Sequence, residues 1–315
     1  MDLNLLLKIA NKYSTLTNFR KKSLELDKFT LDVNTCAKEK VDSFRHIYEN
    51  TIDKIKDYGE IIYASNMNDL NNLTGIIDCC FDTYAIMQYS TKNNTNKYIA
   101  CKGLFVNSIK ILYEINCLSL NGFADGAFAR WRSLYENFVI IKLLIKLDEE
   151  TAELFLKYQT VIKAKRIIDF NKLSVSNSND DLNSILDEFE KLKKKYSEEF
   201  LSFNGWLYKA FPQREDRAFT KLSAYIGNTE WLFPYRLACD YMHCNSFSSF
   251  ESLGKVNGQF PMGPSESGLN FPLNLTITIA IYICVNLTDE FTGINHIGIF
   301  IHNYLLKILE IISKM

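Results

Sequence analysis

Arg236 and His243 are the pair of side chains in this chain best suited to chemistry. They lie in WLFPYRLACDYMHCNSFSSF, a segment with helical spacing of apolar residues. A separation of seven residues turns a helix through about 700°, so both side chains project from one face, roughly 10 Å apart along the axis. A fixed cation beside an imidazole, a group that titrates near neutrality, suits metal-free cleavage of an RNA phosphodiester.

Such cleavage uses the 2′-hydroxyl of the substrate as its nucleophile. It needs a base at that oxygen, an acid at the leaving oxygen and positive charge at the phosphate. We expect His243 to serve as general acid or base and Arg236 to hold the phosphate by two parallel hydrogen bonds. Because one imidazole serves one proton transfer at a time, we expect a homodimer that brings a second copy of both residues.

A structural interpretation of the same pair stays open, because this spacing also arises by chance. Asp240 lies four residues after Arg236 and three before His243. It is therefore placed to form a helical ion pair with either residue. In that case the three side chains form a polar cluster that stabilises the helix and carries no activity.

The segment ARWRSLYEN supplies a second group of charged residues on an apolar helix. Arg130 and Arg132 diverge by about 200° on a helix, so they cannot both face one ligand. Arg132 and Glu136 share a face, and an arginine in apolar surroundings must be paired. We expect an Arg132–Glu136 bridge that docks against the helix of Arg236. Alternatively, Arg132 or Arg130 lines the same pocket, to which Tyr158 would add a hydroxyl.

Composition favours an all-α helical bundle. Hydrophobic residues make up 47% of the 315 residues, and there are only 5 Pro and 13 Gly, which suits long helices. With 36 basic and 37 acidic residues the net charge is −1, so a globally basic RNA-binding surface is excluded. We expect residues 1–65 to form an N-terminal helical hairpin or extension and residues 66–315 a helical domain, although one domain is also compatible with the pattern.

Several features point to a cytoplasmic protein without metal or cofactor. The 8 Cys contain no C-x-x-C pair and fit reduced core residues. The four histidines are dispersed without metal-ligand spacing, and no glycine-rich nucleotide motif is present. The uncharged stretch 267–288 is diluted by Asn and Thr, which favours a buried central helix over a membrane span. A long Gly/Ser/Pro-rich passage, 246–268, is of the kind that is often functional or mobile.

The order of four motifs resembles an uncharacterised bacterial group whose helical domain looks HEPN-like. These motifs are ARWRSLYEN, ELFLKYQTVIKAK, FNGWLYKAF and YRLACDYMHCNS with the later GPSESGLNFPLNL, and they span about 120–290. The resemblance implies a helical protein that is usually dimeric. It also implies a ribonuclease, since many HEPN proteins are metal-independent ribonucleases of toxin–antitoxin and phage-defence systems. Their signature, an Arg and a His separated by four to six residues, matches Arg236 and His243. The residue after that Arg is often polar in active members, and here it is Leu237.

Three functions follow as expectations. The leading one is an endoribonuclease that acts on RNA in growth arrest or anti-phage defence, with an antitoxin or defence protein as partner. The competing one is a non-catalytic helical module that binds a partner protein, RNA or a nucleotide. The third is a membrane-associated effector that uses the uncharged stretch 267–288.

Overall fold

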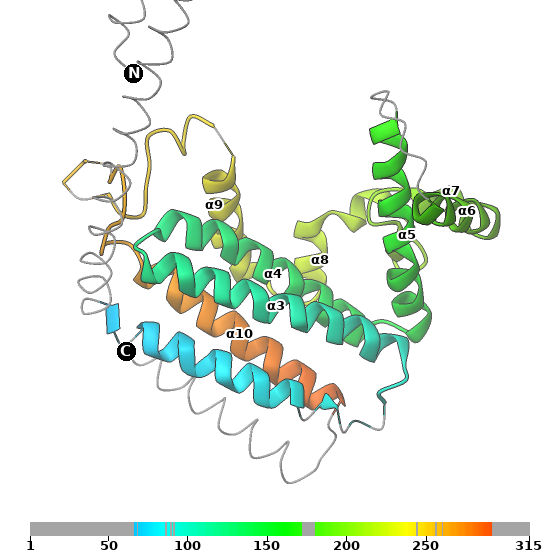
Figure 1. Ribbon diagram of the computed structural model, residues 1–315, viewed down its shortest axis with the longest axis horizontal. Coiled ribbons are helices and arrows are strands. Elements are labelled where there is room, and N and C mark those ends of the chain that lie inside the picture. Colours follow the sequence, from blue (N-terminus) through cyan, green and yellow to red (C-terminus); the bar gives the residue numbers. More distant parts are fainter. Residues whose placement is uncertain are drawn as a thin grey trace, which may run out of the picture. The chain divides into compact units, whose positions relative to one another are not determined.

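The computed structural model describes residues 66–291, apart from 68, 86, 89, 91, 172–179, 244, 256 and 260. The chain divides into two units, Met1–Glu60 and Ile61–Met315, and all the described residues belong to the second. Within them the structure is helical and contains no β-strand (Figure 1), which confirms the all-α prediction. The hairpin expected over 1–65 lies outside the described residues, and so do residues 292–315 of the expected helical domain.

The helices follow the apolar periodicity of the sequence closely. A helix over residues 69–85 precedes the labelled elements. These are α3 (Asn96–Leu120), α4 (Ala124–Lys146), α5 (Glu149–Asn171), α6 (Asp180–Lys195), α7 (Glu198–Leu201), α8 (Phe219–Tyr225), α9 (Leu232–Met242) and α10 (Asn270–Phe291). Three short 3-10 turns lie between α7 and α9: η1 (Gly205–Leu207), η2 (Arg214–Arg217) and η3 (Thr229–Trp231).

A tight turn folds α4 back onto α3. Gly122 adopts φ 74°, a left-handed conformation that glycine reaches without steric cost. Its N–H donates to Ser119 O at 3.0 Å, and the N–H of Phe123 donates to Leu118 O at 2.9 Å. This pair of bonds satisfies the last carbonyl groups of α3 and ends that helix. The chain then starts α4 at Ala124, so the two helices pack along their length.

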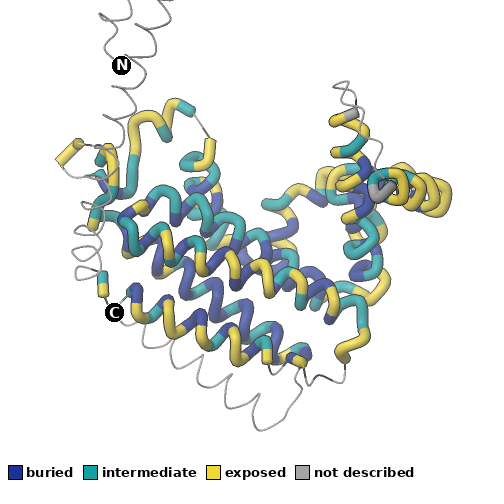
Figure 2. Tube along the Cα trace, in the orientation of Figure 1, coloured by how far each residue is buried: buried dark blue, intermediate teal, exposed yellow. Residues whose placement is uncertain are grey.

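Helix α4 is the centre of the core. It packs against α3, α9 and α10 (Figure 1), and Figure 2 shows buried positions along these helices. Its aromatic residues stack on one another, with ring centroids 5.6 Å apart for Phe128–Trp131 and 5.5 Å for Trp131–Tyr135. Each of these three side chains is fully buried. Large buried rings of this kind dominate the energetics of a core, so α4 fixes the frame on which α9 rests.

Helix α10 contains most of the uncharged stretch 267–288 noted in the sequence. It is one helix of the described part that is long and apolar enough, by length and composition, to cross a membrane. Most of that window is nevertheless buried inside the protein, against α4 and α3. Its Cys284 thiol lies 3.5 Å from the thiol of Cys80, on the helix over residues 69–85. The burial matches that expected for a central core helix.

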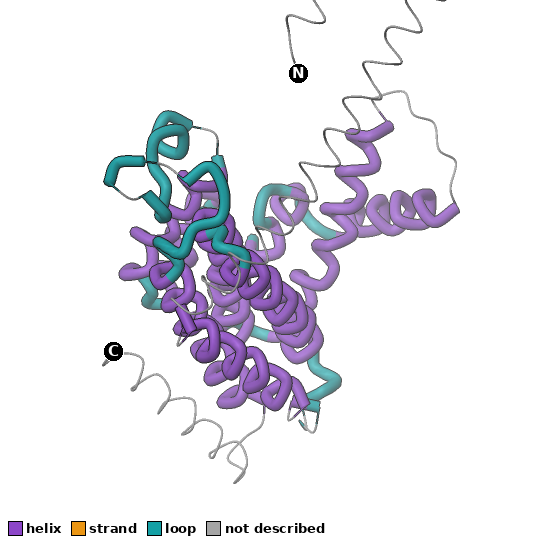
Figure 3. The backbone as a smooth tube through the Cα atoms, turned by 60° about the vertical axis from the view of Figure 1, so that its left-hand side comes forward, coloured by secondary structure: helices purple, strands orange, loops and turns teal. Residues whose placement is uncertain are grey.

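The long loop after α9 is tied to the start of α4 (Figure 3). The carboxylate of Asp125 accepts a hydrogen bond from Leu253 N at 2.7 Å, and Gly122 O accepts one from Ser265 N at 3.0 Å. Gly268 closes the loop at φ 80°, where an added Cβ would lie 2.2 Å from Leu253 O. This loop was expected to be functional or mobile, and it is anchored at Leu253 and Ser265 to the start of α4 and the turn before it.

Candidate functional site

Arg236 and His243 both lie on the surface of α9. The helix ends at Met242, one residue earlier than a helix containing both would require, and His243 is its C-cap in an extended conformation. The N–H of His243 still donates to Cys239 O at 3.2 Å, so the residue continues from the last helical turn. Both residues are exposed. Neither side chain has a hydrogen bond or ion pair with any residue that the structure describes.

Asp240 does not connect the two residues. Its carboxylate accepts a hydrogen bond from the Asn245 side-chain amide at 3.1 Å, just beyond the helix. The ion pair with Arg236 or His243 that the spacing suggested is not formed, because the chain turns back after His243 and brings Asn245 to the carboxylate instead. Ser248 stabilises the same turn by donating to His243 O at 2.6 Å. Arg236 and His243 are therefore not members of a structural polar cluster.

The predicted Arg132–Glu136 bridge is present and docks against α9. The two charged groups lie 2.8 Å apart on α4. The Tyr235 hydroxyl donates to Glu136 at 3.0 Å, and the Arg132 guanidinium lies 5.4 Å from the Tyr235 ring centre. Another guanidinium nitrogen approaches the Met242 sulfur at 3.1 Å. The cluster thus holds α9 at Tyr235, beside Arg236, and at Met242, beside His243.

The electrostatics of this cluster keep Arg132 charged. Burial alone lowers the pKa of the guanidinium, but the hydrogen bond to Tyr235 and the charge of Glu136 outweigh it, so the net shift is upward. Burial raises the pKa of the Tyr235 hydroxyl, which therefore stays protonated and can donate to Glu136. The Nε of Arg132 is buried and has no partner among the described residues. With 22% of its side chain exposed, Arg132 is a partly open cation at the α4–α9 contact.

Arg130 points to a different neighbour, as the divergence of the two arginines predicted. It forms an ion pair with Glu114 of α3 and a hydrogen bond to Ser133 at 3.2 Å. It therefore stabilises the α3–α4 contact. The structure gives it no contact with α9.

Tyr158 lies in another part of the described unit. Its hydroxyl donates to Ser202 O, and its ring packs edge-on against Phe200 of α7 at 5.8 Å. The structure does not bring Tyr158 into contact with Arg236 or His243. The predicted site therefore reduces to α9 and the Arg132–Glu136 bridge beneath it.

Two contacts of this site were missed from the sequence. Tyr235 and Met242 each precede a candidate residue by one position, and they form the side of α9 that meets α4. The available signal was helical spacing, which places Tyr235 and Met242 on one side of α9, about 100° from Arg236 and His243. Arg217, the fully buried arginine of η2, was also missed.

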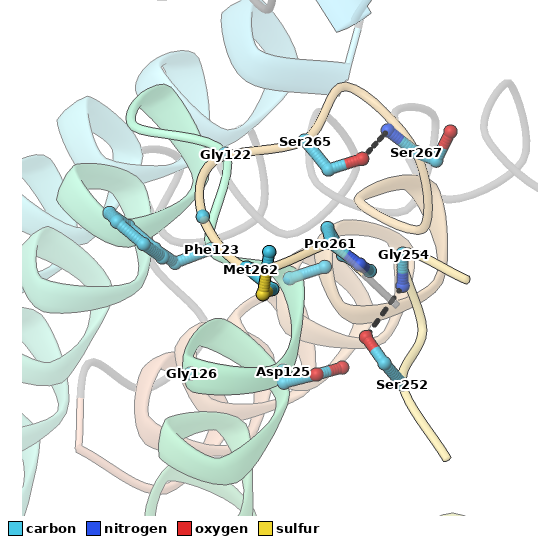
Figure 4. Close-up of a pocket in the computed structure, with 12 residues that line it drawn as sticks. Gly122, Phe123, Asp125, Gly126, Ser252, Gly254, Pro261, Met262, Ser265 and Ser267 are labelled. Atoms are coloured by element: carbon cyan, nitrogen blue, oxygen red, sulfur yellow. Dashed lines mark hydrogen bonds between the residues drawn. The ribbon is translucent and has the colours of Figure 1, made fainter. Parts of the chain in front are cut away.

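Neither of two cavities contains Arg236 or His243. One, of about 260 Å³, lies between the start of α4 and the loop 252–267 (Figure 4), and Asp125 is the charged side chain in its lining. The other, of about 240 Å³, is an apolar groove between α3 and α5. No group of three or more His, Cys, Asp or Glu within the described ranges is arranged to hold a metal ion. Arg236 and His243 lie on an exposed face and line neither of these two cavities.

The fold and the face define an all-helical protein with an exposed Arg/His pair braced from beneath by a buried aromatic core. Residues 98–260 match the model of DUF5677, a family of unknown function, and this match covers just over half of the chain. The chain therefore belongs to the DUF5677 family. No curated protein and no solved structure matches it. The HEPN-like resemblance is not part of the family description and remains a prediction.

Proposed function

We propose that this protein is a metal-independent endoribonuclease that acts as a homodimer in growth arrest or anti-phage defence. The supporting observation is that Arg236 and His243 are both exposed on one face of α9 and are not engaged by other described side chains. Charged groups that serve only to stabilise a fold usually have partners, as Arg130 and Arg217 do here.

The reaction would proceed by in-line transfer at phosphorus. A neutral imidazole removes the proton from the 2′-hydroxyl, and the 2′-oxygen then forms a bond to phosphorus. The bond from phosphorus to the 5′-oxygen breaks, and that oxygen takes a proton from an imidazolium. The products are a 2′,3′-cyclic phosphate and a 5′-hydroxyl end. Arg236 would stabilise the negative charge that builds on the phosphate oxygens.

A second copy of the chain would supply the second imidazole. His243 is the histidine that the described residues contain, so one α9 face offers one group for proton transfer. Two proton transfers in one step need two such groups, or one group used twice in succession. A dimer that brings the two His243 ends of α9 together meets this need.

A non-catalytic binding module is the second candidate, and Leu237 is the observation that favours it. This residue follows Arg236, where active HEPN proteins often have a polar side chain, and here it packs partly buried against the core. An α9 face without that polar group would still bind a phosphate through Arg236. It would then recognise RNA, a nucleotide or an acidic partner protein without cutting.

Incubation of purified protein with total RNA in EDTA separates the two candidates. We expect cleavage with 5′-hydroxyl ends, and a loss of at least about a hundredfold in His243→Ala, since general acid–base catalysis contributes about that much or more. Arg166→Ala is the matched control, because Arg166 is an exposed arginine of α5. Equal cleavage by His243→Ala would refute the nuclease. Intact RNA, together with growth arrest that survives His243→Ala in cells, would support the binding module.

A further inference from the structure

The exposed face of α9 carries an aromatic ring in line with the charged pair. Phe233, in the first turn, is 72% exposed, whereas Tyr235 and Ala238 of the same helix are buried. At 100° per residue, Phe233, Arg236, Asp240 and His243 fall within an arc of about 80°. Phe233 lies about 4.5 Å from Arg236 and about 15 Å from His243 along the axis. The ring is thus part of the same surface as the charged pair.

We propose that Phe233 is a stacking surface for an unpaired base, and that the α9 face therefore recognises single-stranded RNA. This inference rests on the proposed function, since it names the substrate class of the same site. Aromatic side chains beside cationic ones form the usual surface for single strands, because every base offers a flat face that an exposed ring can cover. In a duplex the bases are stacked and paired, so they cannot reach Phe233 without being flipped out.

Charges of both signs lie around Phe233, and Arg236 is the one that can hold a phosphate. Arg236 is one turn away and has no partner in the part of the chain that the structure describes. Asp240 is the acidic residue on this arc, and the Asn245 amide already hydrogen-bonds its carboxylate. Glu230, in η3, lies near the ammonium group of Lys142, which partly offsets its charge. A phosphate held by Arg236 would leave the adjacent base within reach of Phe233.

Further aromatic residues follow His243 in the sequence. Phe250, in the loop after α9, is 67% exposed, and Phe247 packs edge-on against Tyr241 at 5.8 Å. Exposed rings thus lie before Arg236 and after His243 in the sequence.

Another occupant of the same face is a second copy of this chain. A dimer that meets at the His243 end of α9 leaves Phe233, about 15 Å away, near the entrance of the shared crevice. A dimer centred on Phe233 would instead bury the ring against protein. The exposed, unpartnered cation of Arg236 one turn from Phe233, among the described residues, favours RNA, and the experiment below treats the protein contact as the contrary outcome.

The test measures binding of a fluorescent 2′-O-methyl RNA, which cannot be cleaved because its 2′-oxygen carries no proton. Single-stranded and duplex forms are compared by anisotropy for the wild type, Phe233→Leu and Phe233→Trp. Phe203→Leu is the matched control, because Phe203 is similarly exposed, at 77%, but precedes η1. We expect Phe233→Leu to weaken single-strand binding on the order of tenfold, Phe233→Trp to retain it, and Phe203→Leu to change neither.

An abasic scan gives the sharper result. Removing single bases from the oligonucleotide in turn should reveal one position whose loss weakens wild-type binding but leaves Phe233→Leu unaffected. Equal single-strand binding by wild type and Phe233→Leu would overturn the inference, as would a dimer that dissociates in Phe233→Leu by light scattering. Because the oligonucleotide is uncleavable, this binding test is independent of cleavage. If the protein cleaves RNA in EDTA but Phe233→Leu binds the oligonucleotide as the wild type does, the nuclease proposal stands and the stacking role of Phe233 is rejected. Conversely, Phe233-dependent binding without any cleavage would reject the nuclease and keep the base contact.

Discussion

Two arginines of this protein, Arg132 and Arg217, pair with glutamates in opposite ways. Arg217 in η2 is 0% exposed, and all three guanidinium nitrogens donate hydrogen bonds. Its acceptors are the Glu199 carboxylate, the Ser202 hydroxyl and the carbonyl oxygens of Glu199, Phe211 and Pro212. Arg132 on α4 is partly exposed and leaves its Nε without a partner among the described residues.

The difference separates a structural arginine from one next to a candidate site. A guanidinium with every donor satisfied by its own chain has nothing left for a ligand. It instead closes the segment from α7 to η2, which has little regular structure of its own. The Arg132 cluster also joins two elements, but it uses a sulfur and an aromatic ring as neighbours and keeps part of the cation open. Hydrogen bonds thus distinguish the Arg217 cluster, in which every guanidinium donor is used, from the Arg132 cluster, in which, among the described residues, one is not.

The largest effect on stability is expected from Arg217→Gln. The substitution removes the donor from the carbonyl groups of Phe211 and Pro212 and leaves Glu199 with Arg214 as its remaining arginine partner. The buried acceptors of Arg217 would each lose a hydrogen bond at about 1–3 kcal/mol, so the total loss is expected to be about 3 kcal/mol or more. Urea unfolding followed by circular dichroism measures the loss, with Arg214→Gln as control, because Arg214 also binds Glu199 but is exposed. A loss at Arg217 no greater than at Arg214 would contradict the structural role.

Acid should destabilise the Arg217 cluster by protonating Glu199. Hydrogen bonds from Arg214 and Arg217 lower the pKa of Glu199 from its usual 4.5 to about 2. A lowered carboxyl pKa means that the stabilisation is fully present above pH about 4.5 and is lost as the pH falls toward 2. We therefore expect the melting temperature to decline across this window.

Differential scanning calorimetry from pH 6 to pH 2 measures this decline, and Glu199→Gln identifies its source. The variant should start from a lower melting temperature, because it lacks the charge that faces the two arginines. Its curve should then fall less steeply below pH 4.5, since the amide does not titrate. Parallel curves for the variant and the wild type would show that other carboxylates cause the acid dependence.

The sequence predicted one of these two clusters and missed the other, and the reason is physical. Arg132 and Glu136 are four residues apart on a helix whose apolar pattern is unmistakable, so helical geometry alone pairs them. Arg217 follows the turn FPQRED, and its glutamate lies eighteen residues upstream beyond two short elements. No periodicity relates such positions, because irregular segments have no repeat from which a neighbour can be inferred.

The same limit explains which parts of the site were predictable. The helices α3, α4, α5 and α10 follow from apolar spacing, since each has a side that must be buried. That Arg132 meets α9 was expected, but its contacts with Tyr235 and Met242 depend on how α9 is rotated on α4. Tyr158 was grouped with the site because helix order does not reveal which pairs of helices touch. The structure places it against Ser202 instead.

The smallest effect on stability is expected from Arg132→Gln, and it decides whether the comparison holds. The Arg132–Glu136 pair is partly exposed, and such pairs contribute on the order of 1 kcal/mol or less. Urea unfolding should therefore show about a third or less of the loss seen for Arg217→Gln. Cleavage by the folded variant should still decline, because Tyr235 and Met242 lose a contact that orients Arg236 and His243. If Arg132→Gln instead unfolds the protein as strongly as Arg217→Gln with no separate effect on cleavage, then Arg132 is also structural, and the open cation beneath α9 has no role in the site.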